Sequence, residues 1–154
     1  MHWLENRIPP PLVAALFGLL MWLAARQLPG GLVLPIEWRA GLALVVLLAG
    51  VVICLAGVLS FRNARTTVNP LKPETASAPV SSGIYRYTRN PMYLGFATAL
   101  LAWSIFLAWP PALLGVLSFV LYMNRFQIGP EERALTGLFG SAFAQYCSQV
   151  RRWF

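Results

Sequence analysis

One uninterrupted apolar segment, residues 40–61, most constrains how this chain can fold. It carries no charged side chain over 22 positions. About 20 apolar residues in a helix suffice to cross the ~30 Å hydrocarbon core of a bilayer. Because lipid offers the backbone no hydrogen-bond partners, a segment that crosses it alone must be helical. We therefore predict a transmembrane helix at residues 40–61.

The composition extends this conclusion to most of the chain. Hydrophobic residues make up 58% of the 154 residues, and charged residues only 11%. A soluble domain carries roughly 25% charged residues, so most of this protein's surface must face lipid. The formal net charge of +7 does not indicate nucleic-acid binding, because the basic residues lie between and after apolar segments.

Three further segments are apolar enough to cross the membrane, and they are residues 8–28, 91–109 and 111–128. The last two are separated by Pro110 and Pro111, which cannot sit inside a continuous helix. A tight helical hairpin is therefore expected there.

Proline, glycine and polar residues predict where the last two helices begin and end. The third helix can begin at Pro91, because proline is tolerated in a first helical turn and Asn90 is a good N-terminal cap. The fourth helix should end near Gly129, and Pro130 should begin a new element.

The remainder of the chain is less apolar. Residues 130–153 place apolar side chains at helical intervals, with a bend expected at Phe139 and Gly140, and are typical of an amphipathic interfacial segment. Residues 62–90 form a long loop, which in a compact protein is usually functional. The predicted fold is thus all-α. One domain over residues 1–154 holds about four transmembrane helices, the last two a hairpin, followed by a C-terminal amphipathic helical segment.

The distribution of basic residues predicts the orientation. With a cytoplasmic N-terminus, ten of the twelve lysines and arginines lie inside, and only Arg26 and Arg39 lie outside. This asymmetry fits the positive-inside rule. We expect both termini in the cytoplasm and the chain in the cytoplasmic membrane of a bacterium.

Polar residues gather directly before the third helix at Tyr85, Arg86, Arg89, Asn90 and Tyr93. Arginines and tyrosines are common at membrane interfaces, so composition alone permits a simple interfacial belt. A helix N-terminus beside an arginine is also a ready anion site, and a carboxylate or phosphate of a bound cofactor is the alternative.

A second polar group follows the fourth helix. Glu131 and Glu132 suit the first turn of a helix, where the helix dipole favours acids. Arg125 and Gln127 nearby need partners at membrane depth. A carboxylate there could accept ribose hydroxyls or pair with Arg125.

Other common chemistries find no support in the sequence. Cys54 and Cys147 lack the spacing of a metal site or a disulfide framework and are expected to be free thiols. The chain has no Gly-rich phosphate loop, no Ser/His/Asp set and no HExxH motif. We expect no metal.

Two stretches together resemble the isoprenylcysteine carboxyl methyltransferase and phospholipid methyltransferase family of integral membrane enzymes. They are SGIYRYTRNPMYLG, residues 82–95, and NRFQIGPEERALTGLFGSAFAQYCSQVRRW, residues 124–153. The family pattern is G-x-Y, then R-(H/N)-P-x-Y-x-G, then a hairpin and an E-E segment. The resemblance covers the chain from Phe61 to its end.

The resemblance implies S-adenosylmethionine as methyl donor, in a cytoplasm-facing pocket. The residues that it implies for the cofactor are Ala78, Pro79, Val80, Tyr85, Arg89, Asn90, Pro91, Met92, Tyr93 and Glu131. Arg125 would orient an acidic acceptor with Gln127 beside it, and Glu132 could take a proton from an amine acceptor.

The implied reaction is methyl transfer to a small lipophilic or membrane-embedded acceptor. The acceptor would be a carboxylate such as an isoprenylcysteine-like group, or a lipid amine. Prenylcysteine enzymes usually have histidine where this chain has Asn90. The alternatives are an NADPH-dependent membrane lipid or sterol reductase, which resembles this family near the same motif, and a non-catalytic membrane scaffold.

Overall fold

The computed structural model describes residues 5, 7–63 and 81–154, and these residues contain helices but no strand. The long helices are α1 (Pro10–Gln27), α2 (Ile36–Asn63), α3 (Pro91–Leu107), α4 (Leu113–Met123) and α5 (Gly129–Gln149). Three short turns connect them: the 3₁₀ turns η2 (Gly83–Arg86) and η3 (Pro110–Ala112), and the π-helical turn η4 (Asn124–Ile128).

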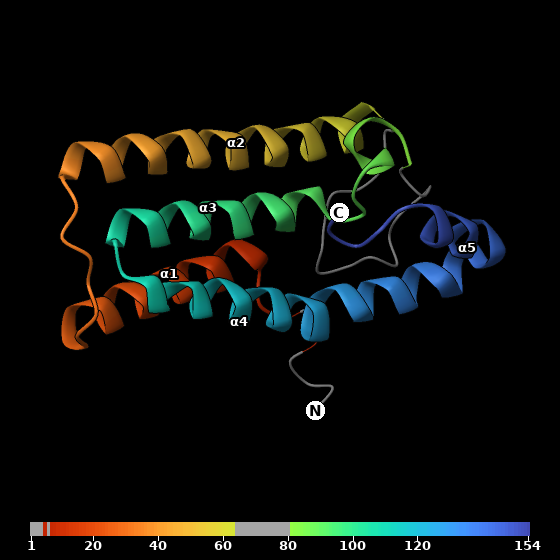
Figure 1. Ribbon diagram of the computed structural model, residues 1–154. Helices are drawn as coiled ribbons and strands as arrows, with labels where there is room; N and C mark the ends of the chain where they lie inside the picture. Colours follow the sequence, from red (N-terminus) through yellow and green to blue (C-terminus); the bar gives the residue numbers. More distant parts are fainter. Residues whose placement is uncertain (1–4, 6, 64–80) are drawn as a thin grey trace.

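The helices form a bundle with α3 at its centre (Figure 1). α3 packs most extensively on α2 and also contacts α1 and α4. The α1–α2 connection and the α3–α4 hairpin lie at one end of the bundle, whereas η2, α5 and the C-terminus lie at the other. This second end carries the candidate functional site.

Among the described residues, three stretches of helix are long and apolar enough to cross a membrane: Pro10–Gln27, Ile36–Asn63 and the continuous stretch Pro110–Gln149. α3 is a shorter apolar helix of 17 residues. At 1.5 Å per residue it reaches about 25 Å, and it lies alongside the others. The expected all-helical membrane fold is confirmed.

The contact between α2 and α3 depends on small residues. The most buried residues of α2 include Ala43, Gly50 and Gly57, which recur every seven residues and so form one stripe along the helix. A Cβ atom on Gly50 would lie 2.9 Å from the carbonyl oxygen of Gly95 in α3, and one on Gly95 would lie 2.7 Å from the carbonyl oxygen of Gly50. The two backbones therefore touch directly.

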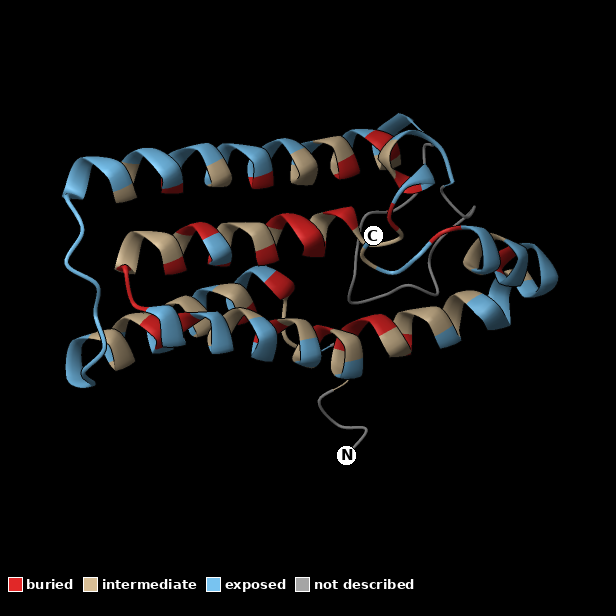
Figure 2. Cartoon of the chain, viewed as in Figure 1, coloured by how far each residue is buried: buried red, intermediate tan, exposed pale blue. Residues whose placement is uncertain are grey.

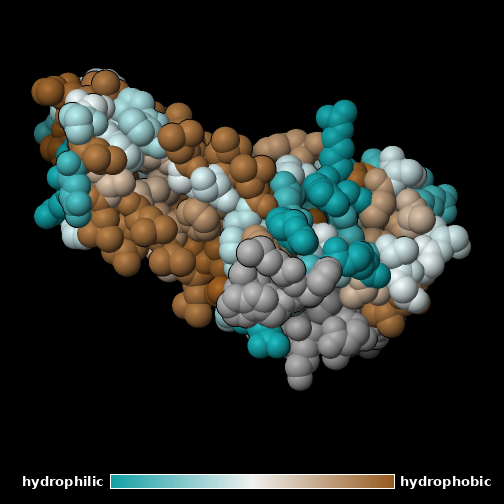
Figure 3. All heavy atoms as spheres, turned by 90° about the horizontal axis from the view of Figure 1, so that it is seen from below, coloured by the Kyte–Doolittle hydropathy of each residue, from teal (hydrophilic) through white to brown (hydrophobic). Residues whose placement is uncertain are grey.

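The interior and the outer surface are both apolar. Phe119, Met123 and Ile128 are fully buried where α4 and η4 meet α1 and α3. The outward face of α2 is exposed (Figure 2), and it presents large side chains such as Val45 and Val52, each 64% exposed. Hydrophobic residues cover much of the bundle surface, and hydrophilic residues gather toward the α5 end (Figure 3). Such a surface suits a lipid environment.

The expected break between the fourth helix and the C-terminal segment is wrong. Gly129 has helical dihedrals, and the chain continues from α4 through η4 into α5 without interruption. A proline inside an α-helix removes a hydrogen bond and clashes with the carbonyl four residues earlier. The π-helical turn widens the helix just before Pro130 and so accommodates it.

Two other expectations are confirmed, and α2 extends beyond the apolar segment that predicted it. Pro110 and Pro111 form the tight turn of the α3–α4 hairpin, with Ala108 in the left-handed region at φ 49°. Gly140 interrupts α5 with φ 52° and ψ −125°, so the predicted bend is present. α2 begins at Ile36, four residues before the apolar segment 40–61. Its first turns therefore include the charged residues Glu37 and Arg39.

The α2–α3 contact generates a stability prediction. Gly95→Ala should destabilise the folded protein by about 1–3 kcal/mol, because the added methyl group would meet the Gly50 carbonyl oxygen and the Cys54 Cβ atom, at 2.7 and 2.9 Å. Thermal unfolding in detergent measures the effect. Gly41→Ala is the matched control, since its Cβ would have nothing within 4 Å. Equal unfolding temperatures for both variants would contradict the packing account.

Candidate functional site

The segment that leads into α3 folds over the end of α2. Gly83 has φ +60°, a region that favours glycine, and a Cβ atom there would lie 2.5 Å from Oγ of Ser60. The following residues form η2, which buries Tyr85. The Tyr85 ring packs edge-on against Phe61 of α2, with the ring centroids 5.2 Å apart. This turn places Tyr85 beside the start of α3.

Glu131 is the centre of a polar cluster at this end of the bundle. Its Oε1 accepts hydrogen bonds from the hydroxyl of Tyr93 and from Nε2 of Gln127, the latter at 2.9 Å. Tyr93 and Gln127 are only 4% and 3% exposed. Both bonds end on the same carboxylate oxygen, so Oε2 can take a further donor. Within the described part of the chain no cation pairs with Glu131.

The helix geometry explains how these residues meet. Gln127 in η4 and Glu131 in the first turn of α5 are four residues apart in a continuous helix, so they lie on the same face. Tyr93 lies in the first turn of a different helix, α3, and its hydroxyl reaches across to the Glu131 carboxylate. The cluster thus joins the beginning of α3 to the α4–α5 junction.

Glu131 has neutral donors on one carboxylate oxygen and no cationic partner among the described residues. A cationic ligand or a set of hydrogen-bond donors would favour its ionised form.

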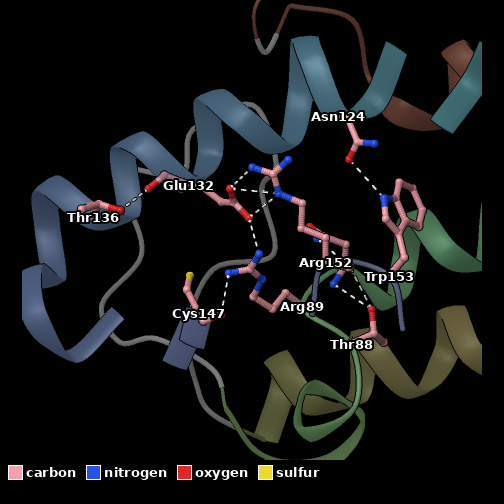
Figure 4. A network of polar contacts seen from close by, with 9 residues as sticks. Thr88, Arg89, Asn124, Glu132, Thr136, Cys147, Arg152 and Trp153 are labelled. Carbon is pink, nitrogen blue, oxygen red and sulfur yellow. Dashed lines mark hydrogen bonds and ion pairs between the residues drawn. The ribbon is translucent and has the colours of Figure 1, made fainter. Parts of the chain in front are cut away.

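Glu132, the next residue, is held by two arginines (Figure 4). Nη2 of Arg89 lies 3.1 Å from its Oε1, and Nη2 of Arg152 lies 2.6 Å from its Oε2. Arg152 adds contacts from Nε at 3.0 and 3.2 Å. Arg89 also donates to the carbonyl oxygen of Cys147 at 3.4 Å. Glu132 therefore ties the loop before α3 to the C-terminal tail.

The tail after α5 is fastened across the entrance of α3. The carbonyl oxygen of Arg151 accepts a bond from the backbone N–H of Arg89 at 3.0 Å. The carbonyl oxygen of Arg152 accepts from Oγ1 of Thr88 at 3.1 Å and from Nδ2 of Asn90 at 3.0 Å. Three consecutive residues before α3 thus bind the backbone of the tail.

Two aromatic side chains complete these connections. Trp153 donates its indole N–H to Oδ1 of Asn124 at 3.1 Å. Tyr146 donates its hydroxyl to the carbonyl oxygen of Tyr85 at 2.7 Å. The C-terminal segment therefore contacts both η4 and η2.

Some of the site residues expected from the sequence come together, and others do not. Tyr93, Gln127 and Glu131 are in direct contact, and Tyr85 is buried at the same end of the bundle. Arg125 is 53% exposed and pairs with Glu5 at 3.3 Å, so it does not reach Glu131 or Glu132.

The remaining expected residues occupy the start of α3. Asn90 stands at the N-cap position, but its side chain makes no capping bond, so the expected cap is absent. Pro91 and Met92 face α2, where a Cβ on Gly57 would lie 3.1 Å from each side chain. Ala78, Pro79 and Val80 are expected cofactor residues that lie outside the described residues, as does most of the predicted loop 62–90.

Sequence reasoning missed four residues of this network, and they are Thr88, Asn124, Arg152 and Trp153. The signal that could have found Arg152 is the Glu131–Glu132 pair itself. Two adjacent acids near a membrane need compensation, and the arginines closest to the chain end are candidates. Backbone contacts such as those of Thr88 leave no such signal.

The described residues offer no metal centre. They contain no group of three or more His, Cys, Asp or Glu side chains placed to hold an ion. Cys54 and Cys147 are free thiols, as expected.

These features define a class of protein: a membrane protein in which the described apolar helices carry a polar cluster at the end of the bundle where α3 begins. The sequence pattern of the phospholipid methyltransferase family matches residues 38–142. The chain belongs to this family. It is also 45% identical over 62 residues to an uncharacterised protein of Haemophilus influenzae, covering 40% of this chain and 98% of that protein. No solved structure has significant similarity to this chain.

The clamp on Glu132 yields a prediction about the tail. Arg152→Gln should loosen residues 150–154, because it removes the stronger of the two ion pairs on Glu132. Hydrogen exchange read by mass spectrometry should show faster exchange in the C-terminal peptide. Arg151→Gln is the control, because only the backbone of Arg151 contacts the loop. Equal exchange in both variants would show that the side-chain clamp does not hold the tail.

Proposed function

We propose that this protein is an S-adenosylmethionine-dependent methyltransferase that acts on a lipophilic acceptor from the bilayer. The observation that carries the proposal is the Tyr93–Gln127–Glu131 cluster, at the end of the bundle where the family motif begins. Membership of a methyltransferase family supports the reaction class. The NADPH-dependent reductase and the scaffold are outcomes that the experiment below distinguishes.

The residues present fit this cofactor. It carries ribose hydroxyls, an α-ammonium group and a sulfonium cation, all of which favour a nearby carboxylate. Glu131 has one carboxylate oxygen held by Tyr93 and Gln127, which leaves the other for the ligand. Tyr85 supplies a buried aromatic surface at the same end. We propose that Glu131 contacts the cofactor, whereas Glu132 positions the loop and the tail around it.

The position of the basic residues supports a cytoplasmic site. The end that carries the cluster holds Arg62, Arg86, Arg89, Arg125 and Arg152. Arg26, in the last turn of α1, and Arg39, near the start of α2, lie at the other end of the bundle. The positive-inside rule then directs the cluster toward the cytoplasm. An S-adenosylmethionine pool in the cytoplasm would reach it directly.

When bound, the cofactor would supply a methyl group on a positively charged sulfur. The chain's own task is to hold the acceptor in line with that group and to exclude water. The apolar bundle serves the second purpose. A lipid acceptor would enter sideways from the bilayer rather than from water.

The structure bears on which acceptor to favour. A carboxylate acceptor needs a cation to hold it, and Arg125, the residue predicted for that role, pairs with Glu5. The family description also names a phospholipid substrate class. We therefore favour a lipid amine. It must lose a proton, and Glu132, the residue predicted to take that proton, is held by Arg89 and Arg152.

Ligand competition in detergent tests the proposal. S-adenosylhomocysteine should displace labelled S-adenosylmethionine from the purified protein, and NADPH should not. Glu131→Gln should weaken S-adenosylmethionine binding by about 1–3 kcal/mol, because a charged hydrogen-bond acceptor is lost. Glu37→Gln, at the far end of α2, is the matched control. NADPH binding would favour the reductase, absence of any binding would favour the scaffold, and unchanged affinity would remove Glu131 from the site.

A second comparison tests the predicted acceptor role of Arg125. If Arg125 orients the acceptor, Arg125→Ala should lower the turnover number more than the cofactor affinity. Arg133→Ala is a close control, because Arg133 pairs with the other oxygen of the same Glu5 carboxylate, at 2.5 Å. Equal losses in both variants would assign the effect to the Glu5 contact and would withdraw Arg125 from the acceptor site.

A further inference from the structure

The junction between α4 and α5 departs from ordinary helix geometry. η4 is π-helical, and the backbone N–H of Gly129 bonds to the carbonyl oxygen of Asn124, five residues earlier. Pro130 follows directly, and in an α-helical turn its ring would clash with the carbonyl oxygen of Phe126. π-helical turns are rare inside α-helices. A turn of this kind needs support from the contacts around it.

The wide turn sets the direction in which Glu131 points. A π-helical turn holds about one residue more than an α-helical turn, and each residue rotates an α-helix by about 100°. If η4 relaxed to α-helical geometry, Glu131 would rotate by about that angle relative to α4. Its carboxylate would then leave the hydroxyl of Tyr93, which belongs to a different helix. The contact between Tyr93 and Glu131 therefore depends on the π-helical turn.

Trp153 contacts this turn from the C-terminal tail (Figure 4). Its indole N–H donates to Oδ1 of Asn124 at 3.1 Å. Its ring packs against the buried core cluster to which Met123 and Ile128 belong, the residues at the end of α4 and the end of η4. Asn124 thus binds Gly129 through its backbone carbonyl and Trp153 through its side chain.

The neighbouring residue of the tail is fixed on the other side of the turn. Arg152 pairs with Glu132 at 2.6 Å, just after the turn, whereas Trp153 binds Asn124 at its beginning. Two consecutive tail residues therefore bridge the π-helical turn from one side to the other. Relaxation of the turn would move Glu132 relative to Asn124, so it would strain or break one of these two contacts.

We propose that Trp153 is a positioning residue for the Glu131 site. By binding Asn124 while Arg152 binds Glu132, it stabilises the π-helical turn and keeps the Glu131 carboxylate directed at Tyr93. It acts through Asn124 rather than by contact with a ligand. The stabilising contact is independent of any ligand, whereas its effect on S-adenosylmethionine binding rests on the proposed function.

NMR of the protein in detergent micelles tests the contact without a ligand. Trp153→Phe keeps an aromatic ring against the core and removes the indole donor. Hydrogen exchange at the Gly129 amide should become about fivefold faster, the equivalent of one net hydrogen bond, because the turn opens more often. Trp109→Phe is the matched control, since its indole N–H donates to the carbonyl oxygen of Pro29, also at 3.1 Å, at the opposite end of the bundle. Unchanged exchange in Trp153→Phe, or equal acceleration in both variants, overturns the proposal.

A double variant tests whether Trp153 acts through Asn124. Asn124→Leu removes the side-chain acceptor and should speed Gly129 exchange to a similar extent, and it gives the measurement even if Trp153→Phe does not fold. The Trp153→Phe/Asn124→Leu variant should exchange no faster than the faster single variant, because the same bond is lost in each case. Additive effects would show that the two residues act separately, and they would overturn the proposal.

Cofactor affinity separates positioning from simple support of the fold. Trp153→Phe should weaken S-adenosylmethionine binding by about fivefold, and Trp109→Phe should leave it unchanged. In a protein that already carries Glu131→Gln, Trp153→Phe should have no further effect, because the carboxylate that it positions is absent. Faster Gly129 exchange with unchanged affinity would overturn the positioning role. If the unaltered protein binds no S-adenosylmethionine, the proposed function fails, whereas Gly129 exchange still decides whether Trp153 holds the turn.

Discussion

The direct backbone contact between α2 and α3 governs the rest of this fold. Lipid supplies no hydrophobic force that drives helices together, so association depends on close packing and polar contacts. Gly50 and Gly95 allow that packing by leaving no side chain between the two helices. α3 is then fixed at the centre of the bundle, and its first turn, with Tyr93, is fixed relative to the α4–α5 junction. The polar site forms where these elements meet.

The two adjacent acids have different surroundings, and this difference organises the site. Glu132 is enclosed by two guanidinium groups, one from the loop before α3 and one from the tail. Glu131 points into the bundle and is held only by neutral donors, Tyr93 and Gln127. One acid thus joins segments of the chain, while the other keeps capacity for a ligand.

The surroundings of Asn90 bear on its departure from the usual prenylcysteine pattern. Its side-chain amide donates to the backbone of the C-terminal tail instead of capping α3. A donor at this position suffices for that contact. Asn90 therefore belongs with Thr88 and Arg89, the residues before α3 that bind the C-terminal tail.

The sequence predicts the architecture well because the dominant forces leave local patterns. Each of the confirmed features has a local cause. Long apolar segments form helices suited to a membrane, Pro110 and Pro111 form the hairpin turn, and Gly140 bends α5. The continuation through Pro130 was not predictable in this way, because it depends on a π-helical turn that tertiary packing stabilises.

The site was only partly predictable for the same reason. Glu131, Gln127 and Tyr93 follow from motif and spacing, and the structure brings them into contact. The partner of Arg125 does not follow, because Glu5 lies 120 residues away in the chain. The tail contacts of Thr88 and Arg89 use backbone carbonyls, which carry no side-chain identity. Such contacts join residues far apart in the chain, so they can be found only once the arrangement of the helices is known.

Transfer of a labelled methyl group to a lipid is the most direct test of methyltransferase activity in this protein. The purified protein would be incubated with methyl-labelled S-adenosylmethionine and a bacterial membrane lipid extract, and the lipids would be analysed by mass spectrometry. The account predicts label in an amine-containing lipid, with little or none in reactions of the Glu131→Gln variant. No labelled lipid from any fraction of the extract, with a folded protein, would contradict it.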